Sequence, residues 1–278
     1  MSDGIFINET IDHLSVDGVS VRYVKAGKEN GVPLLLTAPW PESIFAFNLV
    51  WSDLCKLGPV IAVDLPGFGQ SQGREDLMSP DAMGNFVIKL MAAFGIERAH
   101  VIAPDVGTLA ALFAASKRPD LFESIVAGSG GASMTLLGES LAQVVASKKA
   151  AYVGSDGGEQ VVKFVSGSAR VTIPTEILED YRQSSEGQRW NEAADFVRAY
   201  STDLPRLEKL LPDIQTPVLV ISGKYDPLVP PSNGDFLAGL LPHSRAEIVE
   251  AGHFVWEDAS ADYARLVSSW IMDGYRSV

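Results

Sequence analysis

The stretch "HVIAPDVGTLAA" (residues 100–111) has the pattern of a buried strand that turns directly into a helix. At the turn, "APDVG" (103–107), small residues lie two positions before and after the central Asp105. This spacing is typical of an elbow that holds a nucleophile on a strained backbone, where larger neighbours would clash. Because aspartate is also a favoured helix N-cap, the five residues alone leave two interpretations open, a nucleophile and a cap.

Strand and helix patterns alternate on both sides of this turn. Short apolar runs bounded by Gly and Pro predict buried strands, and runs with helical spacing predict helices. Strands are expected at 19–27, 32–39, 59–67, 98–104, 123–130, 217–223 and 245–252, and helices at 43–57, 80–95, 107–117 and 261–275. The alternation predicts an α/β fold with a mostly parallel sheet flanked by helices.

A helical segment interrupts this alternation. Between residues 132 and 211 only helical patterns occur, and strand patterns return after it. We therefore expect a core formed by residues 1–131 and 212–278, with a helical insertion at 132–211.

The composition is that of an acidic globular protein. The chain has 278 residues, of which 46% are hydrophobic and 21% charged, and a net charge of −13. This charge argues against nucleic acid and anionic membranes as partners. The stretch 1–18 lacks the apolar run of a signal peptide, and no segment approaches the ~18 apolar residues of a membrane span. We expect a cytoplasmic monomer or homodimer, with the single cysteine, Cys55, as a core thiol.

Three further motifs each follow an expected strand: "DLPGFGQS" (64–71), "SGKYDPLVP" (222–230) and "AGHFVWED" (251–258). Catalytic groups gather at the carboxyl ends of strands in open α/β sheets. Over nearly its whole length the chain resembles the α/β-hydrolase fold family, in which a helical cap follows the sixth core strand. The family's order of nucleophile, acid and histidine maps onto Asp105, Asp226 and His253.

The positions of the four histidines support the assignment of His253. Of the four histidines, only His253 comes just after a late core strand; the others are His13, His100 and His243. We expect Asp226 to orient the imidazole of His253.

An aspartate nucleophile changes the expected reaction. Its carboxylate is ionised at neutral pH, and attack on a carbonyl would give a strained anhydride. Attack on a saturated carbon that bears a leaving group gives an ordinary ester, which water activated by His253 can hydrolyse. The resemblance therefore narrows to the epoxide hydrolase and haloalkane dehalogenase branch.

The leaving group distinguishes these two activities. Haloalkane dehalogenases usually carry a tryptophan after the nucleophile, where this chain has Val106. Epoxide hydrolases use two cap tyrosines, and the resemblance implies Tyr152 and Tyr200, with Tyr181 as a rival donor. We expect an enzyme that opens an apolar epoxide to a diol through an ester on Asp105. The alternatives are a haloalkane dehalogenase, or another hydrolase acting on an activated carbon, and a non-catalytic ligand-binding member of the fold.

The loop "APWPES" (38–43) departs from the family's His-Gly-x-Pro pattern. The resemblance implies an oxyanion hole built from the backbone N–H groups of Trp40 and Val106, and a cis Trp40-Pro41 peptide. Proline in place of glycine at position 39 restricts the loop and puts the preformed hole in question. Substrate contacts are expected from Trp40, Tyr181, Trp190 and Phe254.

Neither a cofactor nor a metal is expected. "DLPGFGQS" lacks the Gly-x-Gly-x-x-Gly spacing of a dinucleotide site and instead predicts a turn that supports the active-site edge. The chain contains no Cys/His cluster with metal-ligand spacing. The expected partners are a small apolar organic substrate and water.

Overall fold

The computed structural model describes residues 9–278. Residues 1–8, the first part of the N-terminal stretch inspected for a signal peptide, lie outside the described residues. Within the described part, no helix has the length and apolar character needed to cross a membrane.

An eight-stranded sheet forms the centre of the molecule, in the order β1-β2-β4-β3-β5-β6-β7-β8. The strands β3 to β8 run parallel, and β2 pairs antiparallel with both β1 and β4. Their bounds are β1 Ile11–Val16, β2 Val19–Gly27, β3 Leu34–Thr37, β4 Pro59–Val63, β5 Ala99–Pro104, β6 Phe122–Gly128, β7 Val218–Gly223 and β8 Ser244–Val249. The predicted architecture, an α/β fold with a mostly parallel sheet, is confirmed.

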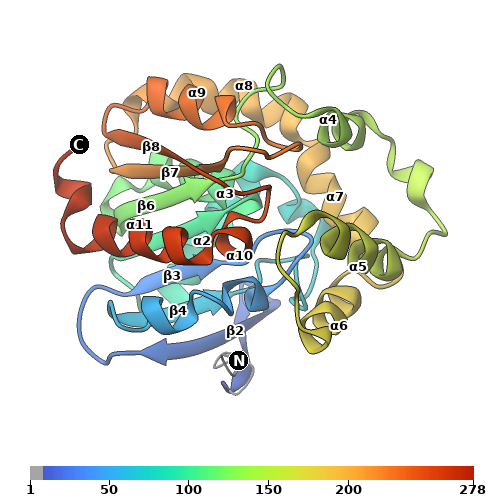
Figure 1. The fold of residues 1–278 in the computed structure, drawn as a ribbon, viewed down its shortest axis with the longest axis horizontal. Helices are drawn as coiled ribbons and strands as arrows, with labels where there is room; N and C mark the ends of the chain where they lie inside the picture. The colour runs from blue at the N-terminus through green and yellow to red at the C-terminus, as the bar shows by residue number, and fades with distance from the viewer. Residues whose placement is uncertain (1–8) are drawn as a thin grey trace.

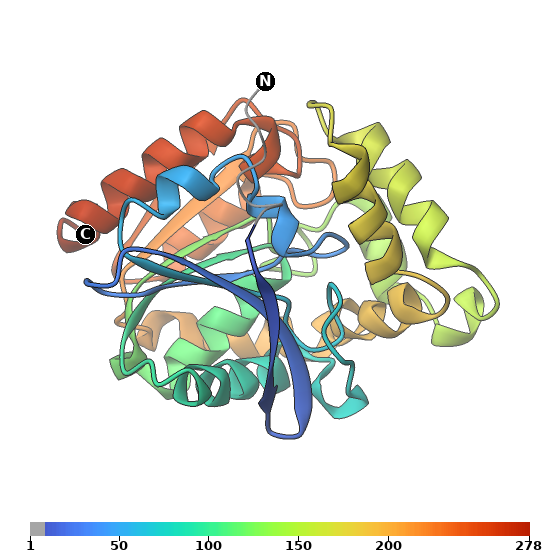
Figure 2. The ribbon, with the colours of Figure 1, turned by 90° about the horizontal axis from the view of Figure 1, so that it is seen from below.

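Helices cover both faces of this sheet (Figure 1). They are α1 Trp51–Leu54, α2 Pro80–Ala93, α3 Val106–Lys117, α4 Glu139–Ala146, α5 Gly157–Ser168, α6 Thr175–Ser184, α7 Arg189–Arg198, α8 Tyr200–Leu210, α9 Ser232–Leu240, α10 Val255–Asp258 and α11 Ser260–Met272. Figure 2 shows α1 and α11 on one face, with α2 and α3 on the other. The helices α4 to α7, which come between β6 and β7 in the chain, form a group to one side of the sheet.

The alternation of side chains along a strand separates two hydrophobic cores. In β5, Val101 and Ala103 pack in the core under α2 and α3, whereas Ile102 between them packs in the core under α1 and α11. Successive residues of a strand point to opposite faces, so a strand that is buried on both faces is apolar throughout. This is why the central strands appear in the sequence as short uninterrupted apolar runs.

The structure differs from the sequence-based expectation in several elements. The expected helix at 43–57 is divided into a 3-10 turn, Ile44–Phe47, and the short helix α1. Most apolar residues in this segment are buried, including consecutive ones. Their spacing in the sequence therefore does not identify one buried face of a single helix. The expected pattern also missed β1 and α9. Cys55, expected in the core, is only partly buried at its edge.

Candidate active site

The turn between β5 and α3 holds Asp105 in a strained conformation, with φ 53° and ψ −122°. The Asp105 backbone N–H donates to the Gly128 carbonyl at 2.8 Å. A Cβ at Gly107 would lie 2.1 Å from the Thr37 hydroxyl, so only glycine fits there. Asp105 precedes α3 as its N-cap residue but makes no side-chain capping hydrogen bond, so capping does not account for the strained backbone. The strain is instead what a nucleophile elbow requires.

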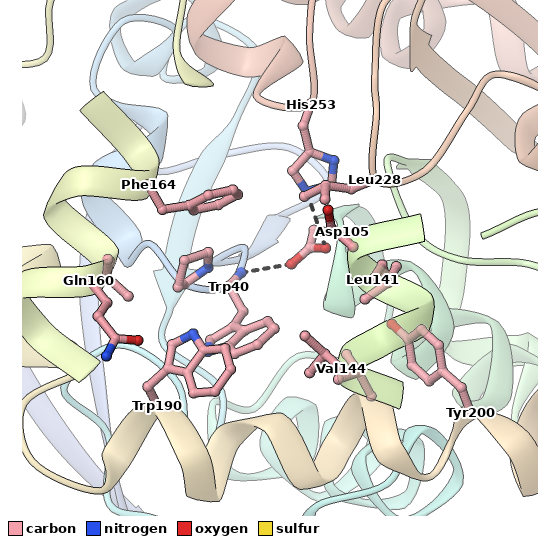
Figure 3. A pocket seen from close by; sticks show the side chains of 14 residues that line it. Trp40, Asp105, Leu141, Val144, Gln160, Phe164, Trp190, Tyr200, Leu228 and His253 are labelled. Carbon is pink, nitrogen blue, oxygen red and sulfur yellow. Dashed lines mark hydrogen bonds and ion pairs between the residues drawn. The ribbon is translucent and has the colours of Figure 1, made fainter. Parts of the chain in front are cut away.

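Two backbone N–H groups stabilise the Asp105 carboxylate. Trp40, which follows β3, donates its N–H to Asp105 Oδ2 at 2.7 Å (Figure 3). Burial raises the pKa of Asp105 to about 6, although the neighbouring His253 and the N–H groups of Trp40 and Val106 lower it. The two expected oxyanion-hole donors therefore lie at the carboxylate despite proline at position 39. The Trp40-Pro41 peptide is cis, as the motif suggested.

His253 and Asp226 meet beside Asp105 from the loops after β8 and β7. His253 Nδ1 is 2.8 Å from Asp226 Oδ2, and the other Asp226 oxygen accepts the N–H groups of Leu228 and Val229. His253 Nε2 lies 3.7 Å from Asp105 Oδ1, which is beyond hydrogen-bond distance. Burial lowers the pKa of His253, but the charges of Asp226 and Asp105 outweigh it, so the pKa is raised. The three side chains form a continuous buried row.

The stretch "DLPGFGQS" supports this edge of the sheet, as expected. Asp64 is fully buried and accepts the backbone N–H groups of Ile44 at 2.8 Å and Gln70 at 2.9 Å. Arg22 pairs with the same carboxylate at 3.3 Å. Burial raises the pKa of Asp64 to about 6. One buried carboxylate thus ties the loop after β4 to the loop that carries Trp40.

A cavity of about 300 Å³ opens beside Asp105 (Figure 3). Apolar and aromatic side chains, several of them from α4, α5 and α7, form most of its wall. Its lining residues are Trp40, Pro41, Asp105, Ser140, Leu141, Val144, Gln160, Val161, Phe164, Trp190, Val197, Tyr200, Leu228 and His253. None of them is a lysine or arginine, so the cavity suits a small uncharged ligand.

Of the two tyrosines expected as leaving-group donors, Tyr200 lines the cavity. It begins α8, is 1% exposed, and points its hydroxyl toward the side of the cavity that holds Asp105 (Figure 3). Among residues 9–278 its hydroxyl has no hydrogen-bond partner. Burial and the charge of Asp105 raise the pKa of Tyr200 well above its ordinary value, so the hydroxyl keeps its proton.

Three other expected site residues are absent from the described lining. Tyr152 packs its ring against Trp190, with 5.1 Å between centroids, on a 3-10 turn outside the cavity. Tyr181 is fully buried and donates its hydroxyl to Glu257 at 3.2 Å. Phe254 is also fully buried and packs its ring against that of the lining residue Phe164, with 5.9 Å between centroids. These placements remove the geometric basis for Tyr152 as a leaving-group donor and for Tyr181 and Phe254 as substrate contacts.

Sequence reasoning missed two kinds of site residue. The first is Ser129, at the end of β6, which has a φ of 50° and donates its hydroxyl to the His253 carbonyl at 3.0 Å. The second is the apolar wall from α5, which includes Val161 and Phe164. The N-cap Asp156, followed by valines four residues apart, was the available signal for that helix. Within the described chain, no group of three or more His, Cys, Asp or Glu side chains is placed to hold a metal ion.

Comparison with known proteins relates this chain to several hydrolases. A family model described as alpha/beta hydrolase fold matches residues 59–155 and 168–260. A pimeloyl-[acyl-carrier protein] methyl ester esterase of Neisseria meningitidis serogroup B is 26% identical over 246 residues, which cover 85% of this chain and 92% of the esterase. A soluble epoxide hydrolase of Corynebacterium sp. is 32% identical over 110 residues, covering 40% of this chain and 38% of that enzyme.

Solved structures share the same architecture. The haloalkane dehalogenase DbeA from Bradyrhizobium elkani USDA94 matches with a TM-score of 0.82 and 20% identity, and the match covers 97% of this chain and 99% of the dehalogenase. At this identity the likeness concerns the fold. The relatives' names span ester, epoxide and haloalkane chemistry, so the reaction must be argued from the site itself.

Proposed function

The chain belongs to the alpha/beta hydrolase fold family, and from this membership and the geometry of its cavity we propose that it opens an apolar epoxide to a diol through an ester on Asp105. The observation that carries this proposal is the placement of the Asp105 carboxylate. One oxygen accepts the Trp40 N–H at 2.7 Å, while the other lies 3.7 Å from His253 Nε2 at the wall of an apolar cavity. We further propose that residues 132–211 act as the cap over this site.

The first step is attack by Asp105 on an epoxide carbon. A carboxylate that attacks a carbonyl forms a reactive anhydride, whereas attack on a saturated carbon forms a stable ester. For this reason we do not carry the methyl ester chemistry named for the Neisseria relative over to this chain. As the carbon–oxygen bond of the epoxide breaks, the Tyr200 hydroxyl donates a hydrogen bond to the developing alkoxide and then gives it a proton, which solvent later replaces on Tyr200.

The second step is hydrolysis of that ester. Alkylation removes the charge of Asp105, which is one of the charges that raise the pKa of His253. The imidazole therefore loses its proton more readily and becomes a base for water. Asp226 keeps the ring oriented through the 2.8 Å contact at Nδ1.

The same backbone donors serve this second step. Water attacks the carbonyl carbon of the ester, and the N–H groups of Trp40 and Val106 stabilise the resulting oxyanion on the former Asp105 carboxylate. The bond between that carbon and the diol oxygen then breaks, and His253 returns the proton to the diol. The remaining proton of the water leaves the restored carboxyl for solvent, and the Asp105 carboxylate keeps one oxygen from water.

Isotope labelling tests this sequence of steps directly. A single turnover in oxygen-18 water, with enzyme in excess over an apolar epoxide, should release unlabelled diol and place the label in the Asp105 carboxyl. Mass spectrometry of the peptide that contains Asp105 measures it. Label in the diol with none in Asp105 would mean direct attack by water. Tight binding without turnover over a broad panel of epoxides and haloalkanes would favour the non-catalytic alternative.

One observation favours haloalkane dehalogenation as a second candidate. Trp190 lines the cavity, and Figure 3 shows the nitrogen-bearing edge of its indole facing inward. An indole N–H is a suitable donor to a departing halide. Halide release from simple haloalkanes, without diol formation from epoxides, would support this candidate over the first.

Replacing Tyr200 with phenylalanine should lower kcat for epoxide opening by about 10²-fold, because the alkoxide loses its hydrogen-bond donor. Steady-state kinetics measures the effect. Tyr152→Phe is the matched control, since its hydroxyl lies outside the cavity, and it should change kcat by less than about threefold. Equal effects of the two substitutions would contradict the assignment of Tyr200.

The pH profile should show the titration of Asp105. Its pKa is raised to about 6, and only the ionised carboxylate attacks, so activity is present above this pH and is lost below it. We expect kcat/KM to fall about tenfold for each pH unit below about 6. Thermal melts over the same range check that the fold persists. If kcat/KM stayed constant down to about pH 4, the pKa of an ordinary aspartate, burial would not raise the pKa of Asp105.

A further inference from the structure

Two buried glutamates come shortly after key groups of the active site, one in the loop of Trp40 and the other in the short helix α10 after His253. Glu42 comes two residues after Trp40, and Glu257 comes four residues after His253. They are 0% and 5% exposed, respectively. The two carboxyl groups are close enough for each to shift the pKa of the other. A hydrogen bond between two carboxyl groups requires that one of them carries a proton.

The donors around the pair account for only two of its four oxygens. Trp256 donates its indole N–H to Glu42 Oε2 at 3.0 Å. Tyr181, from α6, donates its hydroxyl to Glu257 Oε1 at 3.2 Å. The remaining oxygens, Glu42 Oε1 and Glu257 Oε2, are buried and have no donor within the described residues. One proton held between these two oxygens would satisfy both.

No cation compensates the pair in the described part of the chain. Arg22, which lies at α6, binds Asp180 at 2.7 Å and Asp64 at 3.3 Å, and neither glutamate. The other charged groups that act on the pair or on Tyr181 are all carboxylates: Asp105, Asp180 and Asp258. Two adjacent buried negative charges among further carboxylates are strongly unfavourable.

We propose that Glu42 and Glu257 share one proton, and that this proton joins α6 to the loops of Trp40 and His253, so that raising the pH releases the helix. Burial raises the pKa of both carboxyls, in agreement with a proton held at neutral pH. When the proton leaves to solvent, the pair gains a second negative charge and its two carboxylates repel each other. The sharing of this proton is independent of the reaction that takes place at Asp105.

We expect loss of the shared proton to loosen the proposed cap through Tyr181. That side chain is fully buried, and its hydroxyl has Glu257 as its partner. The next contact along α6 is Asp180, which accepts the Ser43 hydroxyl at 2.6 Å. Because Ser43 follows Glu42 directly, repulsion within the pair disturbs both of these attachments of α6, one to the loop of Trp40 and the other to α10. The two glutamates are thus positioning residues and not catalytic ones.

Hydrogen exchange of α6 as a function of pH tests the proposal without any measurement of turnover. After correction for the intrinsic chemical rate, wild-type exchange in the peptide covering Thr175–Ser184 should increase toward alkaline pH, by up to about tenfold per pH unit, the limit for release of one proton. Glu257→Gln should remove this dependence, because the amide is neutral and still donates to Glu42. Glu208→Gln, an exposed change on α8, is the matched control and should behave as wild type.

Infrared spectroscopy of the wild type keeps the proposal testable if Glu257→Gln fails to fold. At pH 8, well above the values of about 6 for Asp64 and Asp105, a protonated carboxyl band that shifts in heavy water should remain. It should disappear at higher pH together with the protection of α6. Absence of the band at pH 8, or the same pH dependence of exchange in wild type and Glu257→Gln, would overturn the proposal.

Discussion

Replacing Asp105 with alanine should lower turnover of an apolar epoxide by more than about a thousandfold, the largest effect expected of any single substitution in this chain. The side chain supplies the atom that bonds to the substrate, and no other carboxylate lines the described cavity. Diol formation, followed by chromatography, measures the loss. The variant should still bind a non-reactive analogue of the substrate, because the apolar wall is unchanged.

The control for this substitution is Asp235→Ala, which makes the same chemical change at an exposed position of α9. It should retain wild-type turnover. Both variants should melt as cooperatively as the wild type. Substantial turnover by folded Asp105→Ala would place the nucleophile elsewhere and would end the proposed mechanism.

Replacing His253 with glutamine should trap the ester on Asp105. The first step needs only the carboxylate and a donor to the leaving oxygen, whereas the second needs a base for water. We therefore expect turnover to fall by more than about a thousandfold while one equivalent of substrate becomes bound to the protein. Intact-protein mass spectrometry should show an increase equal to the mass of the substrate, located on the peptide that contains Asp105.

The double variant Asp105→Ala/His253→Gln provides the control for trapping and should gain no mass. An adduct on any other residue would contradict Asp105 as the nucleophile. Rapid turnover without an adduct in His253→Gln would instead show that another group activates water. The trapping experiment thus separates the two steps that the alanine substitution affects together.

Much of the fold and of the row of three side chains could be predicted because local sequence determines each part. The apolar runs of the strands follow from burial on both faces, and the elbow follows from Gly107, where Thr37 leaves no room for a side chain. Asp226 and His253 come at the ends of parallel strands, and such ends meet at one edge of a sheet. Chain order and strand ends are enough to place these residues together.

The cap could not be placed in the same way. Helical periodicity shows that a helix has an apolar face, but it does not show which neighbour that face contacts. For this reason the sequence kept both Tyr152 and Tyr200 as candidates, while the structure turns only Tyr200 into the cavity. Tyr181 is directed to Glu257 by a contact between residues 76 positions apart.

By itself the sequence determined the α/β-hydrolase fold, the aspartate at the elbow, and the acid and histidine that follow it. These depend on residue type and on position at a strand end, which a linear pattern records. Only the tertiary structure decided that Trp40 still donates to Asp105 despite proline at position 39, which tyrosine faces the cavity, and that Glu42 meets Glu257. These depend on loops and helices packed across large sequence separations, where shape and burial, and not periodicity, select the partner.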